Sequence, residues 1–109
     1  MMPPQDPGTL SMTWVLANAS QQPITCMAAN AANVFVNIVE QGTGNMFGQT
    51  FPCSLGTAVT GSLPSASFDL SFSLYDAQSS LITSAMSKSG VMVTPDHTTD
   101  IGQVVFTVP

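Results

Sequence analysis

The stretch Ser67-Phe68-Asp69-Leu70-Ser71-Phe72-Ser73-Leu74-Tyr75 alternates apolar and polar residues without a break. Successive side chains of a β-strand point to opposite faces of the sheet, so the apolar residues of this stretch share one face. They are Phe68, Leu70, Phe72 and Leu74. The opposite face carries Ser and Asp and must be solvated, as one side of an antiparallel sheet commonly is. The pattern therefore predicts a strand over residues 67–75 in an antiparallel sheet with one wet face.

The same period of two recurs on both sides of this stretch, in short segments separated by clusters of Gly, Pro, Asn and Ser. The other predicted strands cover residues 10–16, 33–40, 46–51, 58–63, 81–86 and 91–93, and a last strand ends the chain with Val104, Phe106 and Val108 on one face. Stretches with a helical period are nearly absent. Seven or eight short strands at this spacing predict an all-β fold, a single antiparallel β-sandwich.

Two segments lie outside this pattern. The string Cys-Met-Ala-Ala-Asn-Ala-Ala at residues 26–32 has the best helical propensity of the chain, and its length predicts one short helical turn. Residues 1–8, Met-Met-Pro-Pro-Gln-Asp-Pro-Gly, are predicted to form a flexible Pro-rich tether. A chain of 109 residues has no room for a second core, so residues 9–109 are predicted to form one sandwich domain.

The charge of the chain excludes several classes of partner. Charged residues make up 6% of the sequence, Lys88 is the only Lys or Arg, and the net charge is −5. Nucleic-acid affinity rests on several Lys or Arg contacts with phosphates, so we expect no nucleic-acid partner. Attraction to anionic membrane surfaces needs the same residues, and no run of eighteen apolar residues predicts membrane insertion. A surface of Ser, Thr, Asn and Gln is typical of secreted bacterial β-domains, which predicts an extracytoplasmic location, periplasmic or at the cell surface.

Cys26 and Cys53 are the two cysteines of the chain, and an oxidising compartment favours one disulfide between them. The alternative is two buried, unpaired thiols. A regular hairpin centred on Gly42 and Thr43 would set Cys53 opposite residue 32 or 33, about six residues from Cys26. If residues 26–32 coil at about 1.5 Å per residue, this gap shrinks to around 9 Å and the chain can bend back to close the bridge.

The residues do not favour catalysis, and neither a cofactor nor a metal is predicted. His97 is the only histidine, and the chain has no Gly-x-Ser-x-Gly motif. Asp96 and Asp100 could hold calcium, but they lack the spacing of a known calcium loop. Trp14 and Tyr75 could stack on a sugar ring, which makes a carbohydrate-binding module with a glycan partner the alternative function. Trp14 belongs to a strongly apolar strand face, so a place in the core is favoured for it.

A resemblance covers most of the chain from residue 10 onward. Residues 63–77 (Leu-Pro-Ser-Ala-Ser-Phe-Asp-Leu-Ser-Phe-Ser-Leu-Tyr-Asp-Ala) are similar to a segment of transthyretin-like, or carboxypeptidase-regulatory-like, β-sandwich domains, and residues 91–102 resemble their closing strands. Residues 10–16, 26–29, 34–36 and 51–53 look like a two-cysteine version found in bacterial cell-envelope lipoproteins. The resemblance implies a transthyretin-like or Ig-like fold and a non-catalytic module with a structural or protein-interaction role. It also implies lipid anchoring in the precursor.

A candidate interaction surface lies in the segment Asn-Val-Phe-Val-Asn-Ile-Val at residues 33–39. This segment is apolar on both faces and uncharged, so Phe35 and Val39 on its back face must be covered by a loop of the same domain or by another subunit. Natural sandwiches blunt their edge strands with Lys, Pro or inward charges, and this chain has a single Lys. We therefore expect a protein partner or self-association through an edge strand, at a surface that includes Phe35 and Val39.

Overall fold

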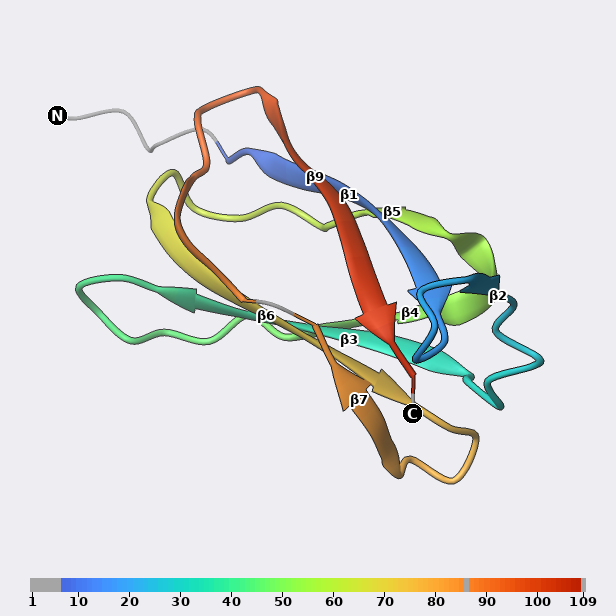
Figure 1. Ribbon diagram of the computed structural model, residues 1–109. Helices are drawn as coiled ribbons and strands as arrows, with labels where there is room; N and C mark the ends of the chain where they lie inside the picture. The colour runs from blue at the N-terminus through green and yellow to red at the C-terminus, as the bar shows by residue number, and fades with distance from the viewer. Residues whose placement is uncertain (1–6, 86, 109) are drawn as a thin grey trace, which may run out of the picture.

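The computed structural model describes residues 7–85 and 87–108, which fold into two packed β-sheets with nine strands (Figure 1). The first sheet is built around β1, with β9 along one side and two short strands, β5 and β2, following one another along the other side. Its strands are β1 (Thr9–Ala17), β2 (Pro23–Ile24), β5 (Thr57–Val59) and β9 (Thr98–Thr107).

The second sheet has the order β4-β3-β6, and the far side of β6 is shared by β7 and β8. Its strands are β3 (Asn33–Glu40), β4 (Gln49–Pro52), β6 (Ser67–Tyr75), β7 (Leu81–Ser84) and β8 (Lys88–Met92). All pairs in this sheet are antiparallel, and β3 pairs with β6 over its whole length. A single 3-10 turn, η1 (Cys53–Leu55), follows β4 and leads into β5 of the other sheet.

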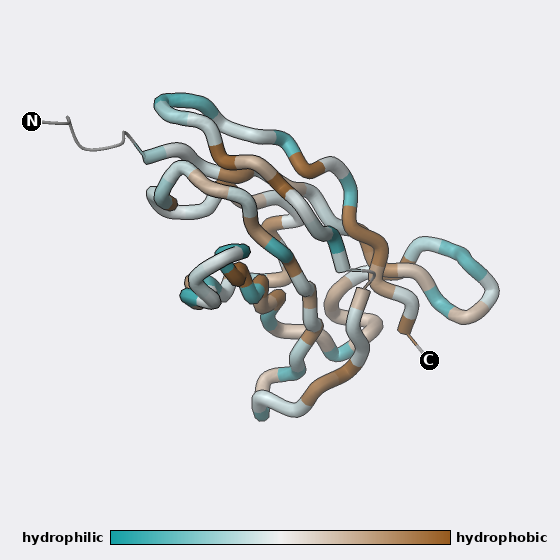
Figure 2. The backbone as a smooth tube through the Cα atoms, turned by 90° about the vertical axis from the view of Figure 1, so that its left-hand side faces the viewer, coloured by the Kyte–Doolittle hydropathy of each residue, from teal (hydrophilic) through white to brown (hydrophobic). Residues whose placement is uncertain are grey.

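The core lies between the sheets, and the inward residues of the long strands are those that the alternating pattern predicted. Buried and less buried residues alternate along both β1 and β6, and Figure 2 shows hydrophobic and hydrophilic positions interspersed along the chain. The inward row of β1 is Leu10, Met12, Trp14 and Leu16, which face the other sheet's Val34, Val36, Ile38, Phe68, Leu70, Phe72 and Leu74. The bounds of β3 and β6 agree with the predicted strands at both ends.

One pair of strands departs from the predicted antiparallel sandwich, because β9 runs parallel to β1 from Thr9↔Thr98 to Ala17↔Thr107. Parallel neighbours need a long crossover connection. Here that connection is nearly the whole domain, since β1 and β9 are the first and last strands of the chain. The pattern of each strand specifies its inward face but not the direction of its neighbour.

Several strand boundaries also differ from the prediction. β2 forms between two predicted strands, β8 begins at Lys88 before the predicted strand at residues 91–93, and β9 begins at Thr98, well before Val104 of the predicted last strand. Each of these short segments is a strand because it pairs with a long neighbouring strand, β1 or β6. Local sequence does not reveal such pairing. Met86, the predicted end of a strand, lies outside the described residues.

Pro7 and Gly8, at the end of the predicted tether, are hydrogen-bonded to the sandwich. The backbone of Gly8 exchanges two hydrogen bonds with Leu63, and the carbonyl of Pro7 accepts from the N–H of Asp96. Gly8 is buried so tightly that an added Cβ would lie 2.3 Å from the backbone oxygen of Thr94. These contacts attach residues 7 and 8 to the sandwich, whereas residues 1–6 of the predicted tether lie outside the described residues. No helix of the described chain is long and apolar enough to cross a membrane.

The central position of β3 corrects the expectation that residues 33–39 offer an edge. Phe35 is paired with Thr50 of β4 on one side and with Ser73 of β6 on the other. Val39 is likewise bridged by Met46 and paired with Asp69. The backbone of β3 is therefore used on both sides, and any association through a strand edge must use another strand.

Candidate functional site

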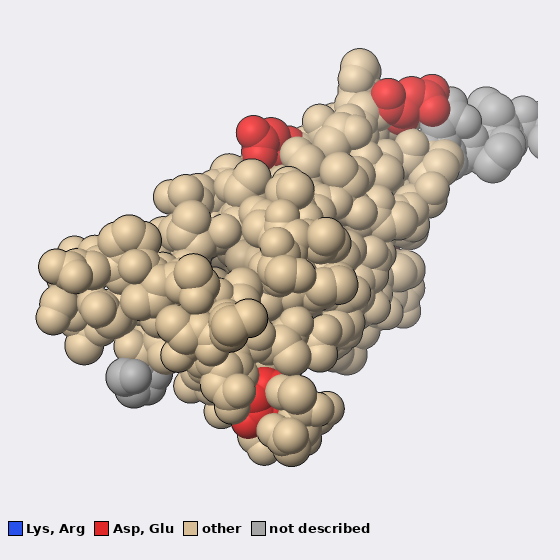
Figure 3. Space-filling view, turned by 90° about the vertical axis from the view of Figure 1, so that its right-hand side faces the viewer, with Lys and Arg blue, Asp and Glu red and all other residues tan. Residues whose placement is uncertain are grey.

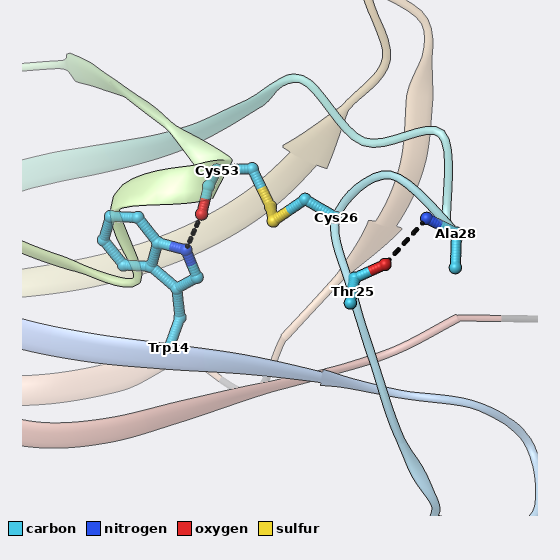
Figure 4. Close-up of a disulfide and its surroundings, with 5 residues drawn as sticks. All are labelled: Trp14, Thr25, Cys26, Ala28 and Cys53. Atoms are coloured by element: carbon cyan, nitrogen blue, oxygen red, sulfur yellow. Dashed lines mark hydrogen bonds between the residues drawn. A yellow bond between two sulfur atoms is a disulfide. The ribbon is translucent and has the colours of Figure 1, made fainter.

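A disulfide joins the two sheets at one end of the sandwich. Cys26 and Cys53 are bonded, with 6.1 Å between their Cα atoms, which confirms the predicted pair (Figure 4). Cys53 lies opposite Ala32, as the hairpin register predicted, since its N–H donates to the carbonyl oxygen of Ala32. The indole N–H of Trp14 donates to the carbonyl oxygen of Cys53 at 2.9 Å, so the buried tryptophan of β1 anchors the same corner.

The segment before β3 coils into the predicted helical turn. Thr25 caps its start, because its Oγ1 accepts from the N–H of Ala28, and the N–H of Ala29 reaches the Thr25 carbonyl. Asn30 closes the turn in the left-handed conformation, with φ 57°, and its backbone N–H donates to the Met27 carbonyl oxygen. The N–H of Ala31 then bonds the Cys26 carbonyl, which completes a Schellman motif. This compact turn brings Cys26 back to the sheet.

A row of backbone groups on β9 has no pairing partner among the described residues. The N–H of Val108 donates to the Ala17 carbonyl, so the even-numbered residues at this end of β9 direct their backbone groups toward β1. Backbone direction alternates along a strand, so Gln103, Val105 and Thr107 direct their N–H and C=O groups to the other side. Within residues 7–85 and 87–108, β9 pairs with β1 alone, which makes this side an open strand edge.

A groove of about 450 Å³ lies along this open edge. One wall consists of Gln103, Val105 and Thr107 of β9, and the other is formed by residues 83–85 and by Lys88 of β8. The first half of β9 is different, because Gly102 at φ 86° creates a bulge opposite β1 and Asp100 adds a charge. Bulges and charges hinder strand addition, so only residues 103–107 present a regular, uncharged edge.

The outer face of the first sheet carries an apolar pair next to this edge. Val15 of β1 and Val105 of β9 are neighbours in register, and their side chains are 39% and 46% exposed. A further hollow over this face is lined by the two valines and by Leu16, Ala17, Gln21, Pro23 and Thr107. Figure 3 views the end of the molecule that carries β2, where the coloured surface includes no Lys or Arg and only separate acidic groups. At the open edge itself, Lys88 is the charged residue that lines the groove.

A second, smaller hollow lies on the outer face of the other sheet. It measures about 270 Å³ and is lined by Asn33, Phe35, Thr50, Tyr75 and Ser79. The strand register explains the grouping, because Asn33 lies opposite Tyr75, and Phe35 lies opposite Thr50. Phe35 of the predicted interaction surface therefore lines this hollow with Tyr75, one of the two residues that the sequence offered for sugar stacking under the alternative function. Trp14, the other one, is buried in the core as favoured.

Only one of the two residues of the predicted interaction surface, Phe35, lines this hollow. Val39 is half-buried on the outer face of β3, four residues after Phe35, and does not line the hollow. Phe35 is half-buried as well, since Gly48 lies over the tip of its ring: an added Cβ there would be 2.8 Å from Cζ of Phe35. A loop of the same domain therefore covers part of this face, which is one of the two predicted outcomes.

The carboxylates near the candidate surfaces take part in local structure. Asp76 accepts from the N–H groups of Gln78 and Ser80, and Asp100 accepts from that of Gly102. Asp69 accepts from the side-chain amide of Gln41. No group of three or more His, Cys, Asp or Glu within the described ranges could hold a metal ion.

The residues 96–100, which the sequence offered as a candidate base and calcium site, form a connecting turn. His97 is exposed, its N–H donates to the Thr94 carbonyl and its own carbonyl accepts from Thr9. Asp96 adopts a left-handed conformation with φ 58°, which tightens the turn into β9. The backbone of this segment thus connects β8 to β9.

Sequence reasoning missed the open edge of β9 and the hollow around Tyr75. The uncharged run Gln-Val-Val-Phe-Thr at residues 103–107 was a usable signal for the edge, because it has neither Lys nor Pro. The hollow had no local signal, since its residues come from three strands and a loop. Comparison with protein families, curated proteins and solved structures finds no match to this chain.

Proposed function

We propose that the protein is a non-catalytic, extracytoplasmic β-sandwich module of transthyretin-like type, which associates with a second copy of itself through the open edge of β9. The observation that carries this proposal is the row of outward backbone groups on Gln103, Val105 and Thr107, which have no partner among the described residues and lie beside a groove of about 450 Å³. An unpaired strand edge is a ready template for another strand. The groove leaves space on the side toward which these groups point.

An antiparallel pair centred on Val105 satisfies the edge symmetrically. Val105 would lie opposite its own copy, and Gln103 would lie opposite Thr107 of the second copy, so that each of these residues exchanges backbone bonds with its counterpart. About six new hydrogen bonds would form, two for each pair of this kind. A two-fold arrangement uses the same patch on both molecules and closes on itself, so the product is a dimer rather than a fibre.

A second copy fits this edge because the segment is complementary to itself. Residues 103–107 carry no charge, so pairing two copies places no like charges opposite each other although each chain carries −5. On the outer face the exposed side chain of Val105 would meet Val105 of the second copy, and Val15 of each molecule would lie one strand further out. The result would be a continuous row of valines across the joined sheets. Residues 103–107 contain no Asp or Glu, so they place no carboxylate beside this row.

The disulfide supports the proposed extracytoplasmic location, because disulfides form and persist in oxidising environments. A cell-envelope role with lipid anchoring in the precursor is the finer proposal, and it rests on the resemblance to two-cysteine envelope domains. The non-catalytic assignment is supported by the structural use of Asp69, Asp76 and Asp100, whose carboxylates accept hydrogen bonds from their own loops and neighbours.

Sedimentation equilibrium over a range of concentrations tests the proposal. We expect a dimer for the wild type and a monomer for Val105→Pro, because proline removes the outward N–H at the centre of the pair without touching a bond to β1. Val105→Ala is the matched control, since it keeps the N–H and should still dimerise, more weakly. A wild type that stays monomeric at millimolar concentration, with the amides of residues 103, 105 and 107 unprotected from hydrogen exchange, would refute self-pairing at this edge.

A further inference from the structure

We propose that the hollow lined by Asn33, Phe35, Thr50, Tyr75 and Ser79 binds a single neutral sugar ring. It lies on the outer face of the second sheet, away from the open edge of β9 in the first sheet. The proposal is therefore independent of self-association and concerns a different kind of ligand.

The walls of the hollow combine two aromatic rings with four polar groups. Phe35 and Tyr75 supply the rings, while the amide of Asn33 and the hydroxyls of Thr50, Tyr75 and Ser79 supply donors and acceptors. None of these polar side-chain groups makes a hydrogen bond to another described residue, in contrast to the loop carboxylates and to Gln49, which bonds Gly61. The four groups are thus available to a ligand.

The position of each group is held by the fold. Asn33, Phe35, Thr50 and Tyr75 stand on neighbouring strands, where cross-strand pairing sets their spacing. Ser79 belongs to the loop that follows β6, and this loop is tied by the Asp76 carboxylate, by the bond from Ser79 N–H to the Asp76 carbonyl, and by the left-handed backbone of Ser79. A preformed arrangement of this kind loses little entropy when it binds.

The chemistry of the walls selects the ligand. No Lys, Arg, Asp or Glu lines the hollow, so neither an anion nor a cation would find a counter-charge there. The net charge of −5 further disfavours an anion. A sugar ring has an apolar C–H face, which can pack on an aromatic ring, and hydroxyls at its rim, which can bond amide and hydroxyl groups.

The size of the hollow limits the ligand to something small. At about 270 Å³ it lies just below the range of ordinary small-molecule pockets, which begins near 300 Å³. It is also open to solvent on the sheet surface, so we expect recognition of one exposed ring, such as a terminal residue of a glycan. Binding of one ring by few contacts should be weak, in the millimolar range of dissociation constants.

Titration of the isotope-labelled protein with methyl glycosides of glucose, galactose, mannose and N-acetylglucosamine, followed by amide NMR, tests the proposal. At least one glycoside should shift the amides of residues 33–35, 50 and 75–79 in a saturable way. Glycerol, which has hydroxyls but no ring, serves as the control ligand and should not saturate. Absence of saturable shifts at these amides with every glycoside would overturn the proposal, whether or not the protein dimerises.

Variants separate the two parts of the site. Tyr75→Phe removes only a hydroxyl and should weaken binding several-fold, whereas Phe35→Ala removes a ring face and should weaken it roughly tenfold or more. Ser71→Ala is the matched control, because Ser71 is exposed on the same outer face of β6 but does not line the hollow. Equal affinity of all three variants would contradict the assignment, provided that their spectra show the native fold.

Discussion

The disulfide end of the sandwich and the open edge of β9 are built in opposite ways. At the disulfide end, Trp14 bonds the Cys53 carbonyl, Thr25 caps the helical turn and Asn30 closes it, so that successive backbone groups have partners. Along the open edge, Val105 and its odd-numbered neighbours keep their backbone groups without a partner among the described residues.

This comparison distinguishes residues that stabilise the monomer from residues whose backbone groups are available for association. Substitutions at the disulfide end should lower the free energy of unfolding, because each removes a bond that exists within the monomer. Substitutions at the open edge should leave that free energy unchanged and alter only association, because the bonds concerned form between molecules. Four variants test this contrast, and their expected effects on the free energy of unfolding decrease in the order given.

The largest effect is expected from removal of the disulfide. Replacing Cys26→Ser together with Cys53→Ser opens a loop with a sequence separation of 27 residues. The chain-entropy relation gives a loss of about 3.6 kcal/mol in the free energy of unfolding. Urea denaturation followed by Trp14 fluorescence measures it, and reduced wild type should lose a similar amount. A loss near zero would show that the turn and the tryptophan hold this end without the bridge.

Trp14→Phe should have the next largest effect. The change deletes the hydrogen bond from the indole N–H to the Cys53 carbonyl and leaves space in a buried site beside Phe51, whose ring centroid lies 6.3 Å from that of Trp14. We expect a loss of about 1–3 kcal/mol. Circular dichroism must follow unfolding, because Trp14 is the only tryptophan. Unchanged stability would mean that the indole contributes neither packing nor its bond.

A smaller loss is expected from Thr25→Ala, which removes the Oγ1 that caps the helical turn at the N–H of Ala28. Loss of such a cap costs about 1 kcal/mol. Thr25→Ser keeps the hydroxyl and is the matched control, which should remain close to wild type in thermal melting. If both variants lose the same stability, the threonine methyl rather than the cap is responsible.

Thr107→Lys at the open edge should have the smallest effect on stability, within about 0.5 kcal/mol, since Thr107 is exposed. Lysine at an edge opposes strand addition, so the same variant should raise the dimer dissociation constant roughly tenfold or more. Thr13→Lys, on the exposed face of the central strand β1, is the control that should leave both quantities unchanged. Sedimentation measures the dimer dissociation constant and thermal melting measures stability. A change in the first without the second would show that this edge contributes to association and not to the fold of the monomer.

Local pattern was sufficient for the inward faces of the strands. Phe68 and Leu74 of β6 and Leu10 and Leu16 of β1 are buried as predicted, because a period of two already says which side chains share a face. The hairpin centred on Gly42 and Thr43 also has the predicted register, since a short turn leaves only a few ways to pair its flanks.

Neighbour relations were not predictable in the same way. Phe35 was assigned to an edge although β3 is central, and the parallel pairing of β9 with β1 was not anticipated. Both depend on contacts between residues far apart in the chain, and a strand of given pattern fits either a central or an edge position. The hollow at Tyr75 escaped prediction for the same reason, because its lining residues are distant in sequence.

The sequence by itself determined the all-β class, the inward residues of the long strands, the helical turn and the Cys26–Cys53 pair, because each follows from local periodicity, propensity or the reach of a short segment. Only the tertiary structure decided which strands are neighbours, which strands lie at the sheet edges and which polar side chains meet on the outer face. Those outcomes depend on how the two apolar faces pack together, and burial of a non-directional apolar surface does not specify strand order.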